Sequence, residues 1–465
     1  MNKPRSNSRR SFVKKLAATS LFSGALFSSL KAKPHILDWE DPSAPAPAAN
    51  DTINLAAIGM GIMGFNNVRT ALRVPGVKLI GACDLYQGRL TRSQEMYGKD
   101  IFTTRDYREV LSRKEVDAVV ISTSDHWHDK ISIAAMEAGK AVYVEKPMVH
   151  QVSEGLAVVK AEQKTGQILQ VGSQRVSSIV NQKARELYAA GEIGDLVLIE
   201  SWIDRQSAMG AWQYSIPTDA SEDTVSWDAF IGDAPKRAFD KTRFFRWRNY
   251  QDYGTGVGGD LFVHLISAVH LILDTPGPER IFATGGLRYW EDGRDVPDVL
   301  IANFDYPKTD THPAFNLQMR VNLIDGGGGG SMTRFIGTEG VMVLNGRSVS
   351  VKKRKMAKAP GYGGWDSYNT FSKGQQAAYK AWYEEHYGVA KKEMIGPDEI
   401  VYKAPEGYSD HYDHWAGFFH AMRTKGKVVE DASFGFRAAG PVLAANVSHF
   451  EQRIIQWDPI VMKMK

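Results

Sequence analysis

Apolar runs of strand length alternate with amphipathic stretches of helix length between residues 52 and 172. The apolar runs are continuous, which is typical of strands buried on both faces of a parallel sheet. This alternation predicts a doubly wound α/β domain, in which ligands bind at the carboxyl ends of the strands. The apolar runs are Thr52–Gly59, Val77–Asp84, Val116–Thr123, Lys140–Pro147 and Gln167–Gly172.

The pattern changes at about residue 174. Leu287–Pro307 and Phe315–Ile324 alternate apolar and polar positions, as half-exposed antiparallel strands do. We therefore predict a Rossmann dinucleotide-binding domain over residues 51–173. A second, α+β domain with an open, mainly antiparallel sheet is predicted over residues 174–465. Residues 352–408 fit this pattern poorly, and their role stays open.

A glycine-rich turn directly follows the first apolar run. Gly59 permits a tight turn, Gly61 lets the backbone approach a pyrophosphate, and Gly64 allows close packing of helix on strand. Asp84 ends the second run, where a ribose-binding carboxylate belongs. Its charge favours NAD, with NADP as the alternative because Arg89 lies close in sequence. The competing interpretation of Asp84 is a helix cap.

The first residues of the chain resemble an export signal. Arg9 and Arg10 precede a mildly apolar stretch that is too short and too polar for a stable membrane span. We predict a twin-arginine signal peptide over residues 1–34, a linker over 35–50 and a periplasmic location. The alternative is a disordered basic N-terminus. The twin-arginine route exports folded proteins, so a cofactor bound in the cytoplasm would travel with the chain.

Net charge argues against a nucleic-acid partner. The formal charge is +4, but the first 34 residues carry eight lysines and arginines and no acid, so the remainder carries −4. Cys83 is the single cysteine, which excludes an intramolecular disulfide. The exported chain must then be stable from its core alone.

Several motifs occur in the order seen in one oxidoreductase family. The glycine turn and Asp84 are followed by SDHWH (124–128), EAGKAVYVEKP (137–147) and VGSQR (171–175). With these motifs the chain resembles the glucose–fructose oxidoreductase/inositol dehydrogenase (Gfo/Idh/MocA) family from about Thr52 to at least Pro307. The resemblance implies NAD(P)-dependent chemistry on sugars or polyols. It also implies a C-terminal sheet that serves oligomer contacts, so we expect a homo-oligomer.

The resemblance also assigns the catalytic residues. Asp260 and His264 reproduce its Asp-x-x-x-His pair, and two side chains four positions apart share one face of a helix. The imidazole would take the hydroxyl proton, with the carboxylate orienting the ring. Lys146 would bind the reacting oxygen. The alternatives are a solvated lysine, a core histidine and an aspartate that caps its helix.

Cofactor binding is implied for the glycine turn and for the ends of neighbouring strands. The residues are Gly59, Gly61, Ile62, Met63, Gly64, Asp84, Ser124, His126, Glu145 and Lys146. His126 is expected to contact the cofactor beside the nicotinamide. Asp125, His126 and His128 do not complete a four-ligand zinc site, so we predict no metal.

The sequence leaves three functions open. We favour an exported NAD(P)-dependent oxidoreductase that moves hydride between a tightly bound nicotinamide cofactor and a carbohydrate. The first alternative is an NAD-dependent glycosidase that oxidises C3 transiently and eliminates the aglycone; the intact Glu-Lys-Pro motif argues mildly against it. The second is a non-catalytic sugar-binding protein of the same fold. Arg246, Trp247, Arg248 and Tyr250 are candidates to wall a sugar site, or to form a packed loop.

Overall fold

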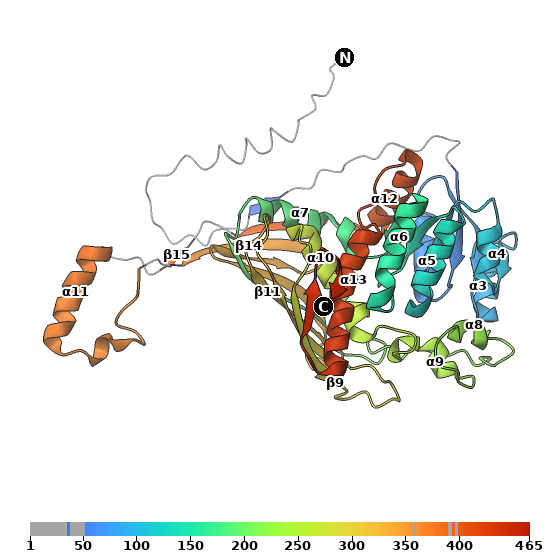
Figure 1. The fold of residues 1–465 in the computed structure, drawn as a ribbon. Helices are drawn as coiled ribbons and strands as arrows, with labels where there is room; N and C mark the ends of the chain where they lie inside the picture. Colours follow the sequence, from blue (N-terminus) through green and yellow to red (C-terminus); the bar gives the residue numbers. More distant parts are fainter. Residues whose placement is uncertain (1–34, 38–51, 357–358, 389–392, 396–398) are drawn as a thin grey trace, which may run out of the picture. The chain divides into compact units, whose positions relative to one another are not determined.

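The computed structural model describes residues 35–37, 52–356, 359–388, 393–395 and 399–465 (Figure 1). The predicted leader and most of the predicted linker lie outside these residues. Within the linker, His35–Leu37 form strand β1, which pairs in parallel with β16 (Ile400–Lys403). These three residues therefore belong to a sheet.

The first domain contains the predicted parallel sheet. Its six strands have the order β4-β3-β2-β5-β6-β7, and every neighbouring pair is parallel. All side chains of β5, β6 and β7 are buried, which explains the continuous apolar runs. The strands are β2 (Ile53–Ile58), β3 (Val77–Cys83), β4 (Phe102–Thr104), β5 (Ala118–Ile121), β6 (Ala141–Val144) and β7 (Leu169–Val171).

Helices connect these strands, as the amphipathic stretches predict. They are α2 (Ile62–Ala71), α3 (Gln87–Tyr97), α4 (Tyr107–Ser112), α5 (His128–Glu137) and α6 (Gly155–Thr165). A further helix, α12 (Asp410–Thr424), comes from near the end of the chain. Its Trp415 stacks on Tyr143 of β6 with 3.9 Å between ring centroids. The core of the first sheet therefore includes a helix from the range predicted as the second domain.

The second sheet is mixed and mainly antiparallel. Within the described residues it has 12 strands in the order β1-β16-β14-β13-β12-β8-β11-β10-β9-β17-β18, with β15 beside β14. The β8–β11 and β1–β16 pairs are parallel. The strands not yet given are β8 (Leu196–Asp204), β9 (Arg280–Gly286), β10 (Val299–Tyr306), β11 (Phe315–Asn322), β12 (Gly330–Gly337), β13 (Gly340–Leu344), β14 (Ser348–Met356), β15 (Glu393–Ile395), β17 (Ile455–Asp458) and β18 (Lys463–Met464).

One face of the second sheet is covered by helices (Figure 1). The helices α7 (Ile179–Ala189), α10 (Val263–Leu273) and α13 (Ala432–Glu451) share a core with its strands. Strand β11 alternates buried and exposed side chains, which confirms the half-exposed pattern predicted there. The helix α11 (Lys373–Tyr387) lies in the segment whose role the sequence leaves open. Among the described residues, no helix has the length and apolarity needed to cross a bilayer.

Residues 205–256 connect β8 to the elements that precede α10, and we refer to them as the 205–256 segment. It contains two short helices, α8 (Trp227–Ile231) and α9 (Lys241–Phe245). Its aromatic side chains form a small core of their own, and Tyr86 of the first domain packs into that core. The segment therefore joins the first domain through packing as well as through the chain.

Candidate functional site

Two glycines of the turn, Gly59 and Gly64, leave no room for a side chain. Gly59 has φ +91°, and a Cβ there would lie 2.6 Å from the carbonyl carbon of Ser122. A Cβ on Gly64 would lie 2.0 Å from the carbonyl oxygen of Gly59. The backbone of the turn therefore lies directly at the start of α2, where free N–H groups favour a phosphate.

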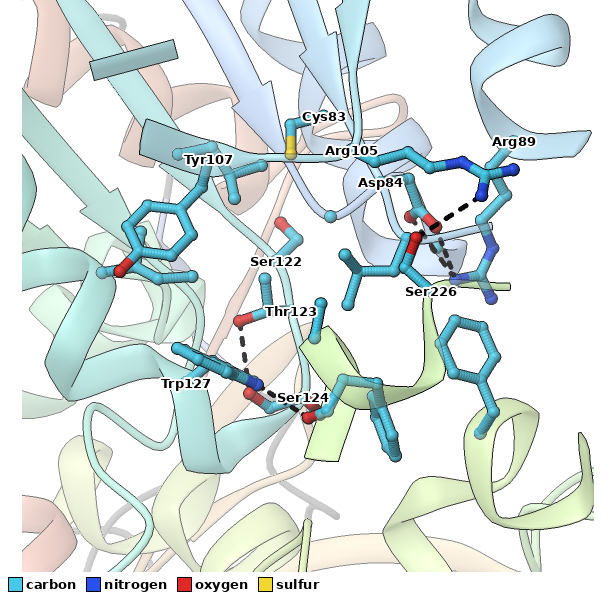
Figure 2. Close-up of a pocket in the computed structure, with 18 of the residues that line it drawn as sticks. Cys83, Asp84, Arg89, Arg105, Tyr107, Ser122, Thr123, Ser124, Trp127 and Ser226 are labelled. Carbon is cyan, nitrogen blue, oxygen red and sulfur yellow. Dashed lines mark hydrogen bonds and ion pairs between the residues drawn. The ribbon is translucent and has the colours of Figure 1, made fainter. Parts of the chain in front are cut away.

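A cavity of about 500 Å³ opens at this turn (Figure 2). One wall comes from the carboxyl ends of the first sheet, including the Ser122–Ser124 loop. The opposite wall comes from the 205–256 segment, including Phe244 and Arg248. Of the predicted cofactor residues, the cavity is lined by Gly59, Gly61, Ile62, Met63, Asp84 and Ser124.

Asp84 faces this cavity and is held by backbone amides. Its Oδ2 accepts a hydrogen bond from Met60 N at 2.7 Å, and its Oδ1 accepts one from Tyr86 N at 2.9 Å. Tyr86 is the N-cap residue of α3 and its side chain makes no capping bond, so Asp84 is not the N-cap of that helix. Arg89 Nη1 lies 3.4 Å from Asp84 Oδ2 (Figure 2).

These features fit a dinucleotide. The turn and the start of α2 suit a pyrophosphate, and an ionised carboxylate suits the hydroxyls of a ribose. The cavity volume is within the range of about 300–1,000 Å³ that ligand sites have. Gly59, Gly61 and Asp84 would hold the cofactor at these points.

A buried ion pair lies at the other end of the site. Lys146 Nζ donates to Asp260 Oδ1 at 2.8 Å and to the backbone oxygen of the same residue at 2.9 Å. The two side chains are only 8% and 7% exposed. Arg248 Nε donates to the same Oδ1 at 3.2 Å, and Arg248 also lines the large cavity. Arg248 therefore connects the ion pair to the proposed cofactor site.

The helix geometry around Asp260 differs from the one predicted. Asp260 lies in a π-helical turn (Gly258–Phe262) that leads into α10. Its side chain accepts hydrogen bonds from Lys146 and Arg248. No hydrogen bond joins Asp260 to His264 in the described structure. His264 lines a small second cavity of about 30 Å³ together with Arg175.

Burial and neighbouring charges set the pKa values of His264 and Asp260. Burial, with the Lys146 ammonium adding to it, lowers the pKa of His264 well below its ordinary value. Burial alone would raise the pKa of Asp260, but Lys146 and Arg248 outweigh it and hold that pKa below its ordinary value. At neutral pH the imidazole of His264 is therefore neutral, and the carboxylate beside Lys146 is ionised.

Two predicted cofactor residues bind other parts of the protein. Glu145 Oε1 accepts from Asn67 Nδ2 at 2.9 Å and from Gln174 Nε2 at 3.1 Å. The buried ring of His126 is not among the side chains that line the large cavity. Its Nε2 lies 2.8 Å from the carbonyl oxygen of Phe230, in the 205–256 segment. Burial lowers its pKa to about 3.

The candidates for a sugar wall divide into two groups. Trp247 and Arg248 line the large cavity. Arg246 Nε donates to the backbone oxygen of Tyr214 at 2.8 Å, and Tyr250 is buried in the small aromatic core. Asn67, which donates a hydrogen bond to Glu145, is a site residue that the sequence analysis does not identify. In the structure it is marked by its burial, because a buried polar side chain needs a hydrogen-bond partner.

The polar side chains of the 125–128 loop also bind backbone. Asp125 Oδ2 accepts from Thr255 N at 2.9 Å, and His128 Nδ1 lies 2.7 Å from the carbonyl oxygen of Pro147. In the part of the chain that the structure describes, no three His, Cys, Asp or Glu side chains are grouped for a metal ion.

Comparison with known proteins agrees with the geometry of the first domain. Residues 53–173 match the model of the GFO_IDH_MocA family, described as an oxidoreductase family with an NAD-binding Rossmann fold. The first domain therefore has the Rossmann fold, and its sequence is similar to the NAD-binding domain of that family.

Two kinds of curated relatives match parts of the chain. Inositol 2-dehydrogenase of Salmonella paratyphi B is 29% identical over 150 residues, which are 32% of this chain and 45% of that protein. A glycosyl hydrolase family 109 protein of Shewanella baltica (strain OS155) is 36% identical over 123 residues, which are 25% and 27% of the two chains. The matched segment thus spans less than half the length of these relatives.

Solved structures show the same fold over most of the chain. Levoglucosan dehydrogenase in complex with NADH and levoglucosan has a TM-score of 0.60 at 16% identity, covering 87% of this chain and 99% of that one. GenD2 from gentamicin A biosynthesis, in complex with NAD, has a TM-score of 0.61 at 16% identity, with 90% and 100% covered.

Proposed function

We propose that the chain is an NAD-dependent oxidoreductase that transfers hydride between a nicotinamide cofactor and a hydroxyl or keto group of a sugar or polyol. The observation that carries the proposal is the position of Arg248. It lines the cavity that begins at the glycine turn, and its Nε binds the carboxylate that also binds Lys146. This chain of contacts links the buried Lys146–Asp260 pair to the cavity and supports placing it beside the cofactor.

The three side chains have complementary tasks. When bound, the nicotinamide ring supplies the hydride acceptor and donor. Neutral His264 is suited to accept the hydroxyl proton at a ring nitrogen during oxidation. Lys146 uses two of its three N–H donors on Asp260, and the third is available for the reacting oxygen, whose negative charge it would offset. Ionised Asp260 holds Lys146 in place.

The similar proteins support a carbohydrate substrate. One curated relative is named an inositol 2-dehydrogenase, and one similar structure holds NADH and levoglucosan. Inositol is a polyol and levoglucosan an anhydrosugar, so both names point to the same class of hydroxyl group.

The direct test begins with the nucleotide. We expect the purified chain to contain NAD or NADH, or to take it up, and denaturation followed by chromatography will identify it. Sugars and polyols are then screened for reduction of that nucleotide by its absorbance. Protein that neither contains nor binds a nicotinamide nucleotide would rule out the proposal.

A second function is favoured by the glycosyl hydrolase family 109 relatives. A hydride that leaves C3 of a glycoside and later returns would allow elimination of the aglycone with no net redox change. The same lysine, histidine and aspartate would serve it. Incubation with aryl glycosides separates the two functions: sustained release of aglycone with no added acceptor supports the glycosidase, and reduced nucleotide without aglycone supports the dehydrogenase. A non-catalytic sugar-binding protein would give neither signal.

We also propose that the chain is exported folded to the periplasm. The support is Arg9-Arg10 ahead of a short, mildly apolar stretch, all outside the described residues. We expect the chain in the periplasmic fraction of its host, and the Arg9→Lys/Arg10→Lys variant in the cytoplasm. An unchanged distribution would contradict export by this route.

A further inference from the structure

The 205–256 segment lines one side of the dinucleotide cavity and contacts the first domain at several places. Near Asp84 it pairs with the chain after β3: Gln87 N donates to Thr224 O at 2.9 Å, and Ser226 N donates to Leu85 O at 2.8 Å. Tyr86 and Val225 form an isolated antiparallel bridge between these bonds. The segment is therefore attached beside the carboxylate that suits the adenosine ribose.

Side chains strengthen this first attachment. Tyr86 Oη donates to Asp219 Oδ1 at 2.5 Å. Arg105 donates to Thr224 O at 3.2 Å and to Ser226 Oγ at 3.4 Å (Figure 2). Charged hydrogen bonds of this kind contribute more than neutral ones. Tyr86 and Asp219 do not line the cavity, so they act on the segment itself.

A second attachment joins residues 230–233 of the segment to residues 126–130 of the first domain. Trp127 Nε1 donates to Phe230 O at 2.9 Å, and the His126 ring lies against the same oxygen. Gly232 has φ +56°, and a Cβ there would lie 2.5 Å from the Trp127 ring. At the surface, Lys130 Nζ lies 2.7 Å from Asp233 Oδ2. Here too the segment lies in direct contact with the first domain.

The third attachment lies near the end of the segment, at Thr255. Thr255 donates to Asp125 Oδ2 from both N and Oγ1, at 2.9 and 2.8 Å. Arg248 reaches Asp260 from the same part of the segment. Between the three attachments, Phe230, Phe244 and Trp247 line the cavity. A dinucleotide that extends from the glycine turn would lie beneath them.

We propose that the 205–256 segment is a strap that retains the dinucleotide through successive turnovers. The inference rests on the proposed function. Release of the cofactor then requires the strap to separate from the first domain at more than one attachment. A retained cofactor must be returned to its starting redox state in place, by a second substrate or by the same substrate later in the cycle.

The test measures release of NADH from the full-length protein. Bound NADH is followed by fluorescence after mixing with a large excess of NAD⁺. Tyr86→Phe removes the bond to Asp219 without touching the cavity wall, and we expect release about tenfold faster, as for the loss of one hydrogen bond to a charged group. Lys130→Glu should speed release several-fold, and Lys130→Glu/Asp233→Lys should restore the slow rate.

Arg92→Ala is the matched control, because it breaks the exposed Arg92–Glu95 ion pair on α3 and touches no part of the segment. Its release rate should equal that of the wild type. If the variants stay folded by circular dichroism and release NADH at the wild-type rate, the proposal that this segment retains the cofactor is wrong. If Tyr86→Phe does not fold, the NADH release rates of Lys130→Glu and Lys130→Glu/Asp233→Lys decide whether the segment retains the cofactor. Failure of the wild type to bind any nicotinamide nucleotide would instead overturn the proposed function.

Hydrogen exchange gives an independent measurement. The backbone amides of residues 219–234 should exchange more slowly when NADH is bound, since the strap must close over it. Equal exchange with and without NADH would contradict retention by this segment.

Discussion

Lys146 lies beside Asp260 because its buried positive charge needs a partner of opposite charge. An ammonium that is 8% exposed is stable only beside an ionised, hydrogen-bonded partner, and Asp260 supplies two oxygen acceptors for it. Arg248 shares that carboxylate. The hydrogen bonds to Asp260 use two of the three lysine N–H donors, and the proposed function assigns the third to a substrate oxygen.

Replacement of Lys146 by methionine tests this role. We expect kcat to fall about 10²–10³-fold, the usual loss when one donor to a developing oxyanion is removed. The loss of unfolding free energy should stay below the roughly 3–5 kcal/mol of a broken buried pair, because Arg248 still binds Asp260. Steady-state kinetics and urea unfolding measure the two quantities. Lys160→Met, at an exposed position on α6, is the control, and an unchanged kcat in Lys146→Met would remove the lysine from the mechanism.

The decline of kcat/KM at low pH is expected to follow protonation of the His264 imidazole. Oxidation needs the neutral imidazole, and burial together with Lys146 lowers the pKa of this residue. We expect kcat/KM to stay constant as pH falls through the ordinary histidine value of about 6.5, and to decline only at lower pH. In Lys146→Met the removed positive charge should shift that decline to higher pH. A wild-type decline centred near pH 6.5 would contradict an imidazole with a lowered pKa.

At the scale of elements, the β2–α2 turn depends on two backbone positions that no side chain can occupy. Gly59 has a positive φ, and Gly64 packs directly on its carbonyl oxygen. This contact holds the start of α2 against the end of β2, where the pyrophosphate would bind. The turn is therefore set by sequence-local sterics.

Gly64→Ala should open this turn. Its Cβ would lie 2.0 Å from Gly59 O, so helix and strand must separate. We expect NADH affinity at least tenfold weaker and a loss of about 1–3 kcal/mol in unfolding free energy. Gly417→Ala on α12 is the matched control: no atom lies within 4 Å of its Cβ, so a gain of about 0.5–1 kcal/mol is expected. Titration by fluorescence and chemical unfolding measure both variants, and equal NADH affinity in the two would contradict the steric argument.

At the scale of the whole molecule, the chain returns to its first sheet after building the second. Helix α12 packs Trp415, Phe418 and Phe419 against that sheet, and Trp415 lies flat on Tyr143. Gln170 Nε2 of β7 also donates to the backbone oxygen of His414 at 2.8 Å. The first domain is therefore completed by residues more than two hundred positions away.

Trp415→Ala measures this long-range contact. We expect a loss of about 3–5 kcal/mol in unfolding free energy, the range for truncating a fully buried aromatic side chain. Trp365→Ala, at a fully exposed position, should stay within about 0.5 kcal/mol of the wild type. Guanidinium unfolding compares the two. Equal stabilities would show that α12 is not part of the core of the first sheet.

Prediction from sequence succeeded where a short motif specifies its own backbone. The parallel strands, the glycine turn and Asp84 at a strand end all follow from local periodicity and spacing. It was incomplete for Asp260, whose hydrogen-bond partners Lys146 and Arg248 come from other segments of the chain. It also did not foresee that His126 would lie against the 205–256 segment, since that contact joins positions about a hundred residues apart.

The sequence by itself determined the dinucleotide domain, because the glycine turn and strand periodicity act over a few residues. The resemblance to a known family brought Lys146, Asp260 and His264 into consideration. Only the tertiary structure decided which side chains meet: that Asp260 binds Lys146 and Arg248, that α12 completes the first sheet, and that the 205–256 segment lines the cavity. Such contacts form when segments far apart in the sequence pack together and release water from their surfaces. The free energy of that packing cannot be read from the local pattern of apolar and polar residues.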